Sequence, residues 1–193
     1  MPQYSHSKLS TFEQCLKKFE FAYINKIIVP EKNIEAFLGN IVHETLEWLY
    51  KKVKENKNKQ IQEIPSIDDI ISFFSKNWTE NYDEEKIKIN NSSNVEYYFN
   101  LGVKFLLDYY IKYRPFEDNT IEIEKMVKIG LDDDNYIIGF VDRLVYDKKN
   151  NEYEIHDYKT ANILPEQDKI DQDKQLGIYS MAIKEIYGAE KKV

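Results

Sequence analysis

The sequence has few cysteine, glycine and proline residues. Its one cysteine among 193 residues is Cys15, so the chain can form no internal disulfide, which suits a reducing compartment. A lone cysteine also excludes an iron–sulfur cluster or an all-cysteine zinc site built by this chain alone. Six glycines and five prolines indicate a low loop content.

Long apolar runs are missing as well, and positive charge is in deficit. No run approaches the roughly 20 residues that cross a bilayer, and the N-terminus MPQYSHSKLS lacks the apolar core of a secretory signal. We therefore expect a cytoplasmic protein with no membrane partner. The net charge of −7 argues against a broad surface that coats nucleic acid, but it suits a metal site built from carboxylates.

Helical periodicity dominates the first part of the chain. Apolar residues recur at helical spacing over 33–56, and a serine cap opens a second helix over 66–78. An aromatic-rich helix over 95–113 stops before Pro115. The polar stretch at 82–94 is expected to be a loop.

The N-terminal stretch 7–24 is rich in Phe and Tyr and is predicted to be helical. Its letters STFEQ form a capping box, with Ser10 as the N-cap and Glu13 three residues later.

The periodicity then changes to that of strands. Alternating or β-rich runs cover 120–129, 136–146 and 153–160, and DDDN at 132–135 is a turn. Short connections between these runs predict an antiparallel meander, and a final helix covers 171–188. Helices, three strands and a helix make an α+β fold.

Two acids lie on neighbouring predicted strands. Asp142 lies within the apolar run YIIGFVDRLVY, where an uncompensated carboxylate is costly. Asp157 lies at the end of the next strand, so a hairpin would bring both acids together, and a divalent cation relieves their repulsion. Oxygen ligands favour magnesium or manganese. The alternative is a salt bridge between Asp142 and Lys159.

Lys159 follows Asp157 by two residues. Side chains alternate along a strand, so these two residues would share one face and Tyr158 would lie on the other. An ammonium group beside a bound cation can orient a water molecule and offset charge that develops on a phosphate. The alternative is an exposed ion pair worth under ~1 kcal/mol.

Further candidates lie on helices and on the first strand. His43 lies about one-third of a turn from the centre of its helix's apolar stripe, so it is either an exposed histidine or a ligand beside the open space at Gly39. Gln175 and Tyr179 are four residues apart and share one helix face; they are either ordinary helix residues or part of a site. Glu124, on the first strand, is either a third carboxylate or a solvated acid.

Five segments, in this order, resemble the PD-(D/E)XK nuclease superfamily and its RecB-like, CRISPR-associated-exonuclease-like branch. They are YSHSKLSTFEQCLKKFEFAYI, GNIVHETLE, GFVDR, IHDYKT and QLGIY. The resemblance implies a restriction-endonuclease-like core, a mixed β-sheet flanked by helices, with an N-terminal helical region. Residues 1–193 would then be one nuclease domain, with a helical insertion at 51–115 and the catalytic sheet and helix at 116–193.

The resemblance also implies a role for each candidate residue. Magnesium or manganese would be bound by His43, Asp142, Asp157 and the main-chain carbonyl of Tyr158. Lys159 would be the catalytic lysine, and Gln175 and Tyr179 would support that lysine or contact the DNA backbone. Glu124 would be a supporting acid.

The implied activity is that of a DNA exonuclease acting on ends or single strands by metal-assisted hydrolysis of phosphodiester bonds. Such an enzyme would serve DNA repair, recombination or the processing of CRISPR or phage DNA, with a helicase or CRISPR-adaptation protein as a further partner. The alternative is a non-catalytic nucleic-acid-binding or scaffolding module that retains the nuclease fold.

The chain departs from this branch in two respects. Some members hold an iron–sulfur cluster with four cysteines; Cys15 stands where the first would be, and the other three would lie beyond Val193. The final letters EKKV stand where another strand would begin, so the chain is either a compact variant or truncated.

Overall fold

The computed structural model describes residues 3–61, 63–90, 92–131, 134–161 and 166–193. The chain divides into two compact units. The helical unit comprises Val29–Ile123 and Tyr158–Asn162, and the sheet unit comprises Met1–Ile28, Glu124–Asp157 and Ile163–Val193. Two residues of the turn expected at 132–135 lie outside the described part, and the predicted division into one domain with an insertion stays a prediction.

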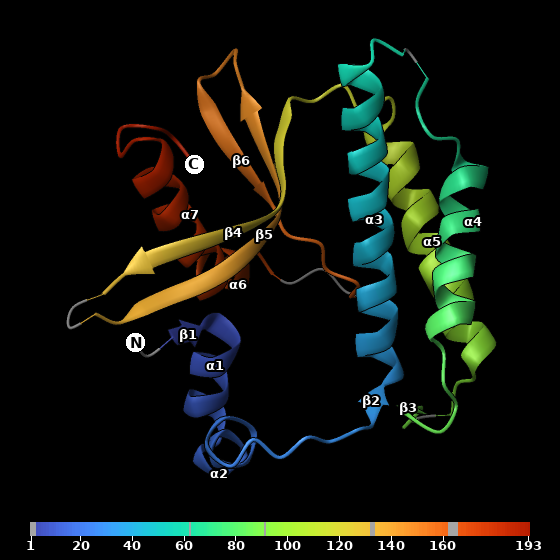
Figure 1. Cartoon of the computed structure of the whole chain (residues 1–193), viewed down its shortest axis with the longest axis vertical. Coiled ribbons are helices and arrows are strands. Elements are labelled where there is room, and N and C mark those ends of the chain that lie inside the picture. The colour runs from blue at the N-terminus through green and yellow to red at the C-terminus, as the bar shows by residue number, and fades with distance from the viewer. Residues whose placement is uncertain (1–2, 62, 91, 132–133, 162–165) are drawn as a thin grey trace. The chain divides into compact units, whose positions relative to one another are not determined.

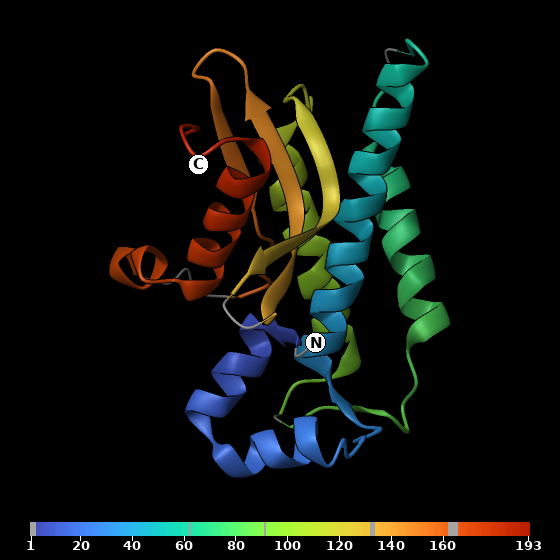
Figure 2. The same ribbon diagram turned by 60° about the vertical axis from the view of Figure 1, so that its left-hand side comes forward.

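Three long helices make up most of the helical unit. α3 (Ile34–Asn58), α4 (Ile67–Asn81) and α5 (Val95–Tyr113) run side by side in Figures 1 and 2. Their facing side chains form an aromatic-rich core in which Leu49 and Phe74 are fully buried. Burial of apolar surface contributes roughly 25 cal/mol per Å², so this core is what holds the three helices together.

Each of these helices begins at a side chain that accepts a backbone hydrogen bond from its first turn. Asn33 and Asn94 accept from the N–H three residues later, and Ser66 forms a capping box with Asp69. All three helices are predicted correctly from the apolar spacing, and the caps explain where they start.

The stretch 82–94 was predicted to be a loop, but part of it is a strand. It contains β3 (Ile87–Lys88), which pairs in parallel with β2 (Lys32–Asn33). A two-residue strand is too short to show an alternating pattern, so periodicity does not reveal it.

Four strands form the larger sheet, which is mixed as expected. The order is β1-β5-β4, and β6 also pairs with β5. β5 and β6 are antiparallel, as a meander requires, whereas β1 is parallel to β5. The strands are β1 (Gln3–Ser5), β4 (Thr120–Gly130), β5 (Tyr136–Asp147) and β6 (Glu152–His156).

The strand predicted over 153–160 is shorter than expected. β6 ends at His156, so Asp157 and Lys159 follow the strand instead of lying in it. The prediction that strand geometry places these two residues on one face is therefore wrong. The alternating pattern in the sequence continues to Tyr158, but β6 leaves its partner after His156, although β5 itself extends back to Tyr136.

The N-terminal stretch forms several short helical segments. They are α1 (His6–Gln14), α2 (Leu16–Phe19) and a π-helical turn (Glu20–Ile24). The predicted cap at Ser10 is wrong, because Ser10 lies inside α1 and the N-cap is Ser5. Ser5 has the extended backbone of an N-cap (φ −134°, ψ 160°).

The C-terminal part of the sheet unit has the predicted helix and, before it, a short helix that was not predicted. α6 (Gln167–Asp171) precedes α7 (Lys174–Tyr187). α7 packs on the sheet, where Tyr187 stacks on Tyr153 of β6 with 4.8 Å between ring centroids. Near the C-terminus, Lys192 forms a single parallel bridge with strand β6, where EKKV was expected to begin a strand. No helix of the described residues is long and apolar enough to cross a membrane.

Candidate active site

Strand β5 carries Asp142 into a buried part of the sheet unit. Asp142 is 8% exposed, and its neighbours Val141 and Arg143 are fully buried. A carboxylate at such a position is costly unless donors or cations compensate it. Burial therefore makes Asp142 a functional candidate in the structure as well as in the sequence.

The pairing of β5 with β6 aligns a second acid with Asp142. The last assigned pair is Arg143 with His156, joined by a 2.9 Å contact between Nη2 and Nδ1. Asp142 directly precedes Arg143 in β5, and Asp157 directly follows His156 at the end of β6. Both carboxylates raise the pKa of the Tyr179 hydroxyl, so the two acids lie on the same side of the hairpin.

Helix α7 adds two polar groups on the same side. Gln175 Nε2 donates to Asp157 Oδ1 at 3.3 Å and to the Tyr179 hydroxyl at 2.8 Å. Asp173 caps α7 and accepts from the Gln175 backbone N–H at 2.7 Å, so the cap fixes the first turn from which Gln175 projects. The predicted common face of Gln175 and Tyr179 is confirmed, and it is directed at Asp157.

Tyr179 is enclosed next to the two acids. It is 5% exposed, and burial raises the pKa of its hydroxyl, with the nearby carboxylates of Asp157 and Asp142 raising it further. The hydrogen bond from Gln175 acts in the opposite direction. The hydroxyl therefore stays protonated at neutral pH, close to both carboxylates.

The donor set of the sheet unit fits a hard divalent cation. Two converging carboxylates repel each other, and a cation between them relieves that repulsion. Carboxylate oxygens are the ligands that magnesium and manganese prefer. The amide of Gln175 already restrains one of the carboxylates, Asp157.

The helical unit brings two other predicted ligands together. His43 on α3 has its Nε2 2.6 Å from the main-chain oxygen of Tyr158. The rings of these two residues also meet edge to face, with centroids 5.6 Å apart. The imidazole nitrogen and the carbonyl oxygen that the resemblance implies as ligands are thus neighbours.

The segment after β6 packs closely on α3 and α5. A Cβ built on Gly39 would lie 3.2 Å from Thr160 Oγ1, so the open space expected at Gly39 is occupied by this segment. The Tyr158 ring also meets Tyr109 of α5 edge to face at 5.7 Å. Tyr109 in turn shares a 2.8 Å hydrogen bond with the Tyr50 hydroxyl.

The predicted site residues therefore form two groups. Asp142, Asp157, Gln175 and Tyr179 belong to the sheet unit, and His43, Tyr158 and the exposed Lys159 belong to the helical unit. The peptide bond between Asp157 and Tyr158 connects the groups, because consecutive residues there belong to different units.

Two further residues of the sheet unit, Glu124 and Gly139, have unusual local geometry. Glu124 in β4 has φ of 50°, a left-handed conformation that few non-glycine residues adopt and that clusters at functional sites. A Cβ on Gly139 would lie 2.4 Å from Tyr179 Cε1, so only glycine leaves room for that ring. A glycine within a strand often marks a place where another group approaches the backbone closely, and Gly139 is the first residue of the GFVDR segment.

Three other acids lie together at the far end of the β5–β6 hairpin. Carboxylate oxygens of Asp147, Glu152 and Glu154 lie within 4.8 Å of one another. Asp147 accepts bonds from its own turn, and Glu152 pairs with Lys192 at 2.7 Å. These interactions give the cluster a structural role, so it carries no argument for a metal site.

Comparisons with known proteins identify the superfamily of the chain but no individual relative. A comparison with curated proteins gives no match. The family model of the PD-(D/E)XK nuclease superfamily matches residues 3–193, nearly the whole chain, without specifying a branch. Proteins of this superfamily are generally nucleases that use divalent metals, and the mixed sheet flanked by helices agrees with its restriction-endonuclease-like core. This chain belongs to the PD-(D/E)XK nuclease superfamily.

Proposed function

We propose that this chain is a magnesium- or manganese-dependent deoxyribonuclease that acts as an exonuclease on DNA ends or single strands. Its substrates would arise in repair, recombination or the processing of CRISPR or phage DNA. Lys159 would be the catalytic lysine. The ligands proposed for the cation are His43, Asp142, Asp157 and the main-chain carbonyl of Tyr158.

The observation that carries this proposal is the double hydrogen bond of Gln175. One side-chain amide restrains both the Asp157 carboxylate and the Tyr179 hydroxyl. Fixing a ligand before the ion arrives lowers the cost of binding. The 2.6 Å approach of His43 to the Tyr158 carbonyl is independent support from the helical unit.

The chemistry assigns a distinct task to each group. When bound, the divalent cation would polarise the phosphate and make a water molecule more acidic. The Lys159 ammonium would offset the charge that develops on the phosphate and orient the attacking water by a hydrogen bond. Gln175 would hold the Asp157 carboxylate, and the Tyr179 hydroxyl would remain a neutral hydrogen-bonding group beside it.

The test is cleavage of a panel of labelled substrates by the purified chain. The panel contains linear single-stranded and double-stranded DNA, a covalently closed circle and RNA of matched sequence, each with manganese, magnesium or chelator. We expect metal-dependent loss of linear DNA, with the closed circle and the RNA intact. Cleavage of the circle would refute the exonuclease assignment, and intact DNA under every condition would favour a non-catalytic binding module.

A further inference from the structure

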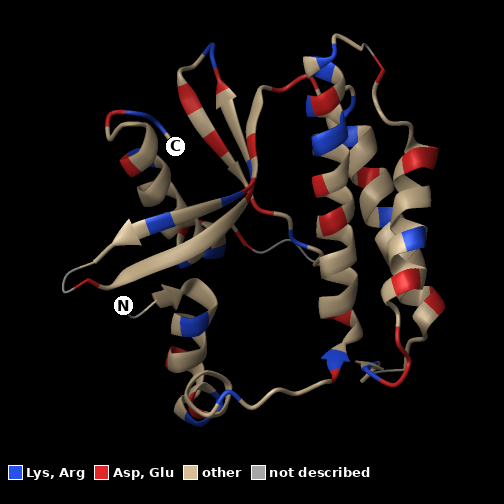
Figure 3. Cartoon of the chain, in the orientation of Figure 1, with Lys and Arg blue, Asp and Glu red and all other residues tan. Residues whose placement is uncertain are grey.

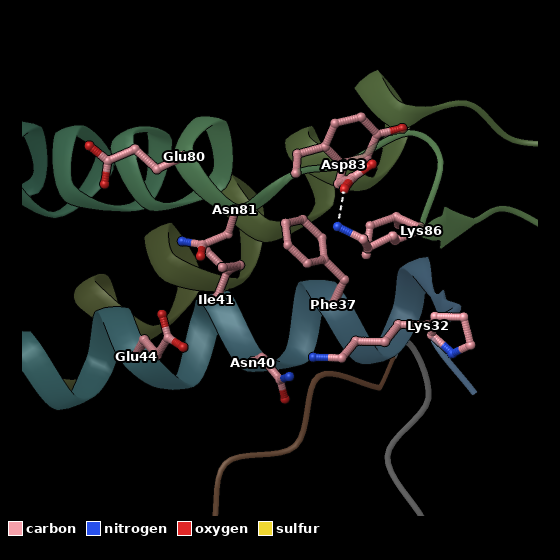
Figure 4. A pocket seen from close by; sticks show the side chains of 12 residues that line it. Lys32, Phe37, Asn40, Ile41, Glu44, Glu80, Asn81, Asp83 and Lys86 are labelled. Atoms are coloured by element: carbon pink, nitrogen blue, oxygen red, sulfur yellow. Dashed lines mark ion pairs between the residues drawn. The ribbon is translucent and has the colours of Figure 1, made fainter. Parts of the chain in front are cut away.

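A pocket of about 500 Å³ lies between the first turns of α3, the end of α4 and the loop that leads to β3. Figure 4 shows its side chains from close by. All twelve lining residues belong to the helical unit. Its volume lies within the roughly 300–1,000 Å³ of small-molecule sites.

The walls of this pocket are held by interactions of the fold itself. β2 and β3 pair at its edge, where Lys32 N–H donates to the Lys86 carbonyl at 2.9 Å. In the loop, Lys86 Nζ pairs with Asp83 at 2.7 Å, and Asp83 Oδ1 accepts from Glu85 N–H at 3.0 Å. The ammonium of Lys86 holds the pKa of Asp83 below its usual range. The pocket is therefore formed without a ligand.

Aromatic rings supply part of its apolar surface, beside Pro30, Ile41 and Ile87. Phe37 meets Trp78 edge to face at 4.9 Å and Tyr82 at 5.9 Å. Burial raises the pKa of Tyr82, so its hydroxyl is neutral at physiological pH. Phe37 and Tyr82 both line the pocket, but Phe37 is only 5% exposed, so the half-buried Tyr82 is the ring against which a flat apolar group can lie.

Two polar side chains of the pocket are not used by the fold. Glu44 accepts from Asn77 at 3.2 Å and Glu80 pairs with Lys76 at 3.8 Å. Within the described parts of the chain, by contrast, neither the Asn40 amide nor the Lys32 ammonium has a hydrogen-bond or ion-pair partner. In Figure 4 the Lys32 ammonium extends towards Asn40. An amide and a cation together suit a ligand with a hydrogen-bonding edge and an anionic group.

We propose that this pocket binds one unstacked nucleotide of a single strand. Its base would lie against Tyr82, the Asn40 amide would hydrogen-bond to the base edge, and Lys32 would contact the phosphate. The inference rests on the proposed nuclease function, because His43 follows Asn40 by three residues, ~4.5 Å along the helix axis. The nucleotide would thus lie next to the proposed metal ligand.

The test compares two short single strands of about ten nucleotides, one normal and one with every base replaced by an abasic sugar. Binding to the full chain is measured in chelator, so cleavage plays no part. We expect the normal strand to bind more tightly, and Asn40→Leu to weaken its binding by roughly five- to tenfold while leaving the abasic strand unchanged. Lys32→Gln should weaken both strands equally.

The matched control is Asn100→Leu on the exposed surface of α5, which should bind both strands like the unmodified chain. Leucine has a higher helix propensity than asparagine, so neither leucine variant should unfold. Equal effects of Asn40→Leu on both strands, or none, would overturn the proposal, as would equal binding of the two strands by the unmodified chain. A chain that binds as expected but cleaves nothing with manganese would refute the nuclease function and leave the pocket standing.

Discussion

At the scale of single residues, Gln175 is the group that connects helix α7 to the acids of the hairpin. Its amide donates to Asp157 and to Tyr179, so a change in either partner reaches the other. Residues that share one hydrogen-bond network show non-additive effects when they are changed. The site should therefore be sensitive to residues that touch no ion and no substrate.

Gly139 is such a residue. Gly139→Ala places a Cβ 2.4 Å from the Tyr179 ring, so the ring must shift and its hydrogen bond with Gln175 is disturbed. We expect a loss of about 1–3 kcal/mol in the free energy of unfolding and slower DNA cleavage. The control is Gly177→Ala on the exposed side of α7, where a Cβ meets nothing within 4 Å and stability should rise by up to about 1 kcal/mol. Equal effects of both changes on cleavage would contradict the account.

The substitution Asp157→Asn distinguishes between two roles for Asp157, a metal ligand and a member of a structural ion pair. Asparagine keeps an acceptor for Gln175 but removes the charge that faces Asp142, so in chelator the free energy of unfolding should be unchanged or higher. Manganese at a hundred times its Kd should stabilise the unmodified chain by about 2.7 kcal/mol and the variant far less. Urea unfolding with and without manganese measures both quantities. A variant that is markedly less stable in chelator would favour a structural pair.

Residue types and their places in the sequence predict much of the candidate site. Asp142 is recognised as an acid within an apolar strand, and its burial is confirmed. The contact of Gln175 with Asp157 could not be predicted, because it depends on where α7 meets the hairpin and not on spacing within either segment. The pairing of Tyr109 with Tyr158 was missed for the same reason.

At the scale of helices and strands, long periodic segments are predictable and short ones are not. The helix that begins after Ser66 has both an apolar stripe and a capping box, so two signals agree. β1 has three residues and no pattern, and its parallel pairing with β5 depends on contacts distant in sequence. The end of β6 at His156 was missed because the sequence does not show where a strand leaves its partner, which here continues to Tyr136.

Helix α5 is expected to support the metal site through Tyr109. Tyr109→Phe removes the hydroxyl bond to Tyr50 and should cost about 1 kcal/mol of stability, while its ring still holds Tyr158. Tyr109→Leu removes that ring contact, so it should also weaken manganese binding about tenfold. Calorimetric titration with manganese measures the affinity.

The control for this pair of changes is Tyr110→Leu. Tyr110 lies next to Tyr109 on α5, but its ring meets Phe116 at 5.6 Å. The substitution Tyr110→Leu should lower the free energy of unfolding without changing the affinity for manganese. If the two leucine variants bound manganese equally well, the contact between Tyr109 and Tyr158 would have no part in the site.

At the scale of the whole molecule, the candidate ligands are divided between two units. The sheet unit contributes carboxylates, and the helical unit contributes an imidazole, a carbonyl and a lysine. The peptide bond between Asp157 and Tyr158 is one of the points at which the chain passes from one unit to the other. Acidic and basic residues are interspersed over the helices in Figure 3, in keeping with the net charge of −7, so substrate contacts should be local and not a broad basic surface.

The central claim is that Lys159 performs the chemistry while other residues hold the metal. The most direct test is single-turnover cleavage of an end-labelled single strand with manganese, comparing the unmodified chain with Lys159→Ala and, as a control, Lys76→Ala on α4. The account predicts that Lys159→Ala cleaves at least about a hundredfold more slowly but binds manganese as before, whereas Lys76→Ala is unchanged. Undiminished cleavage by Lys159→Ala would contradict the account.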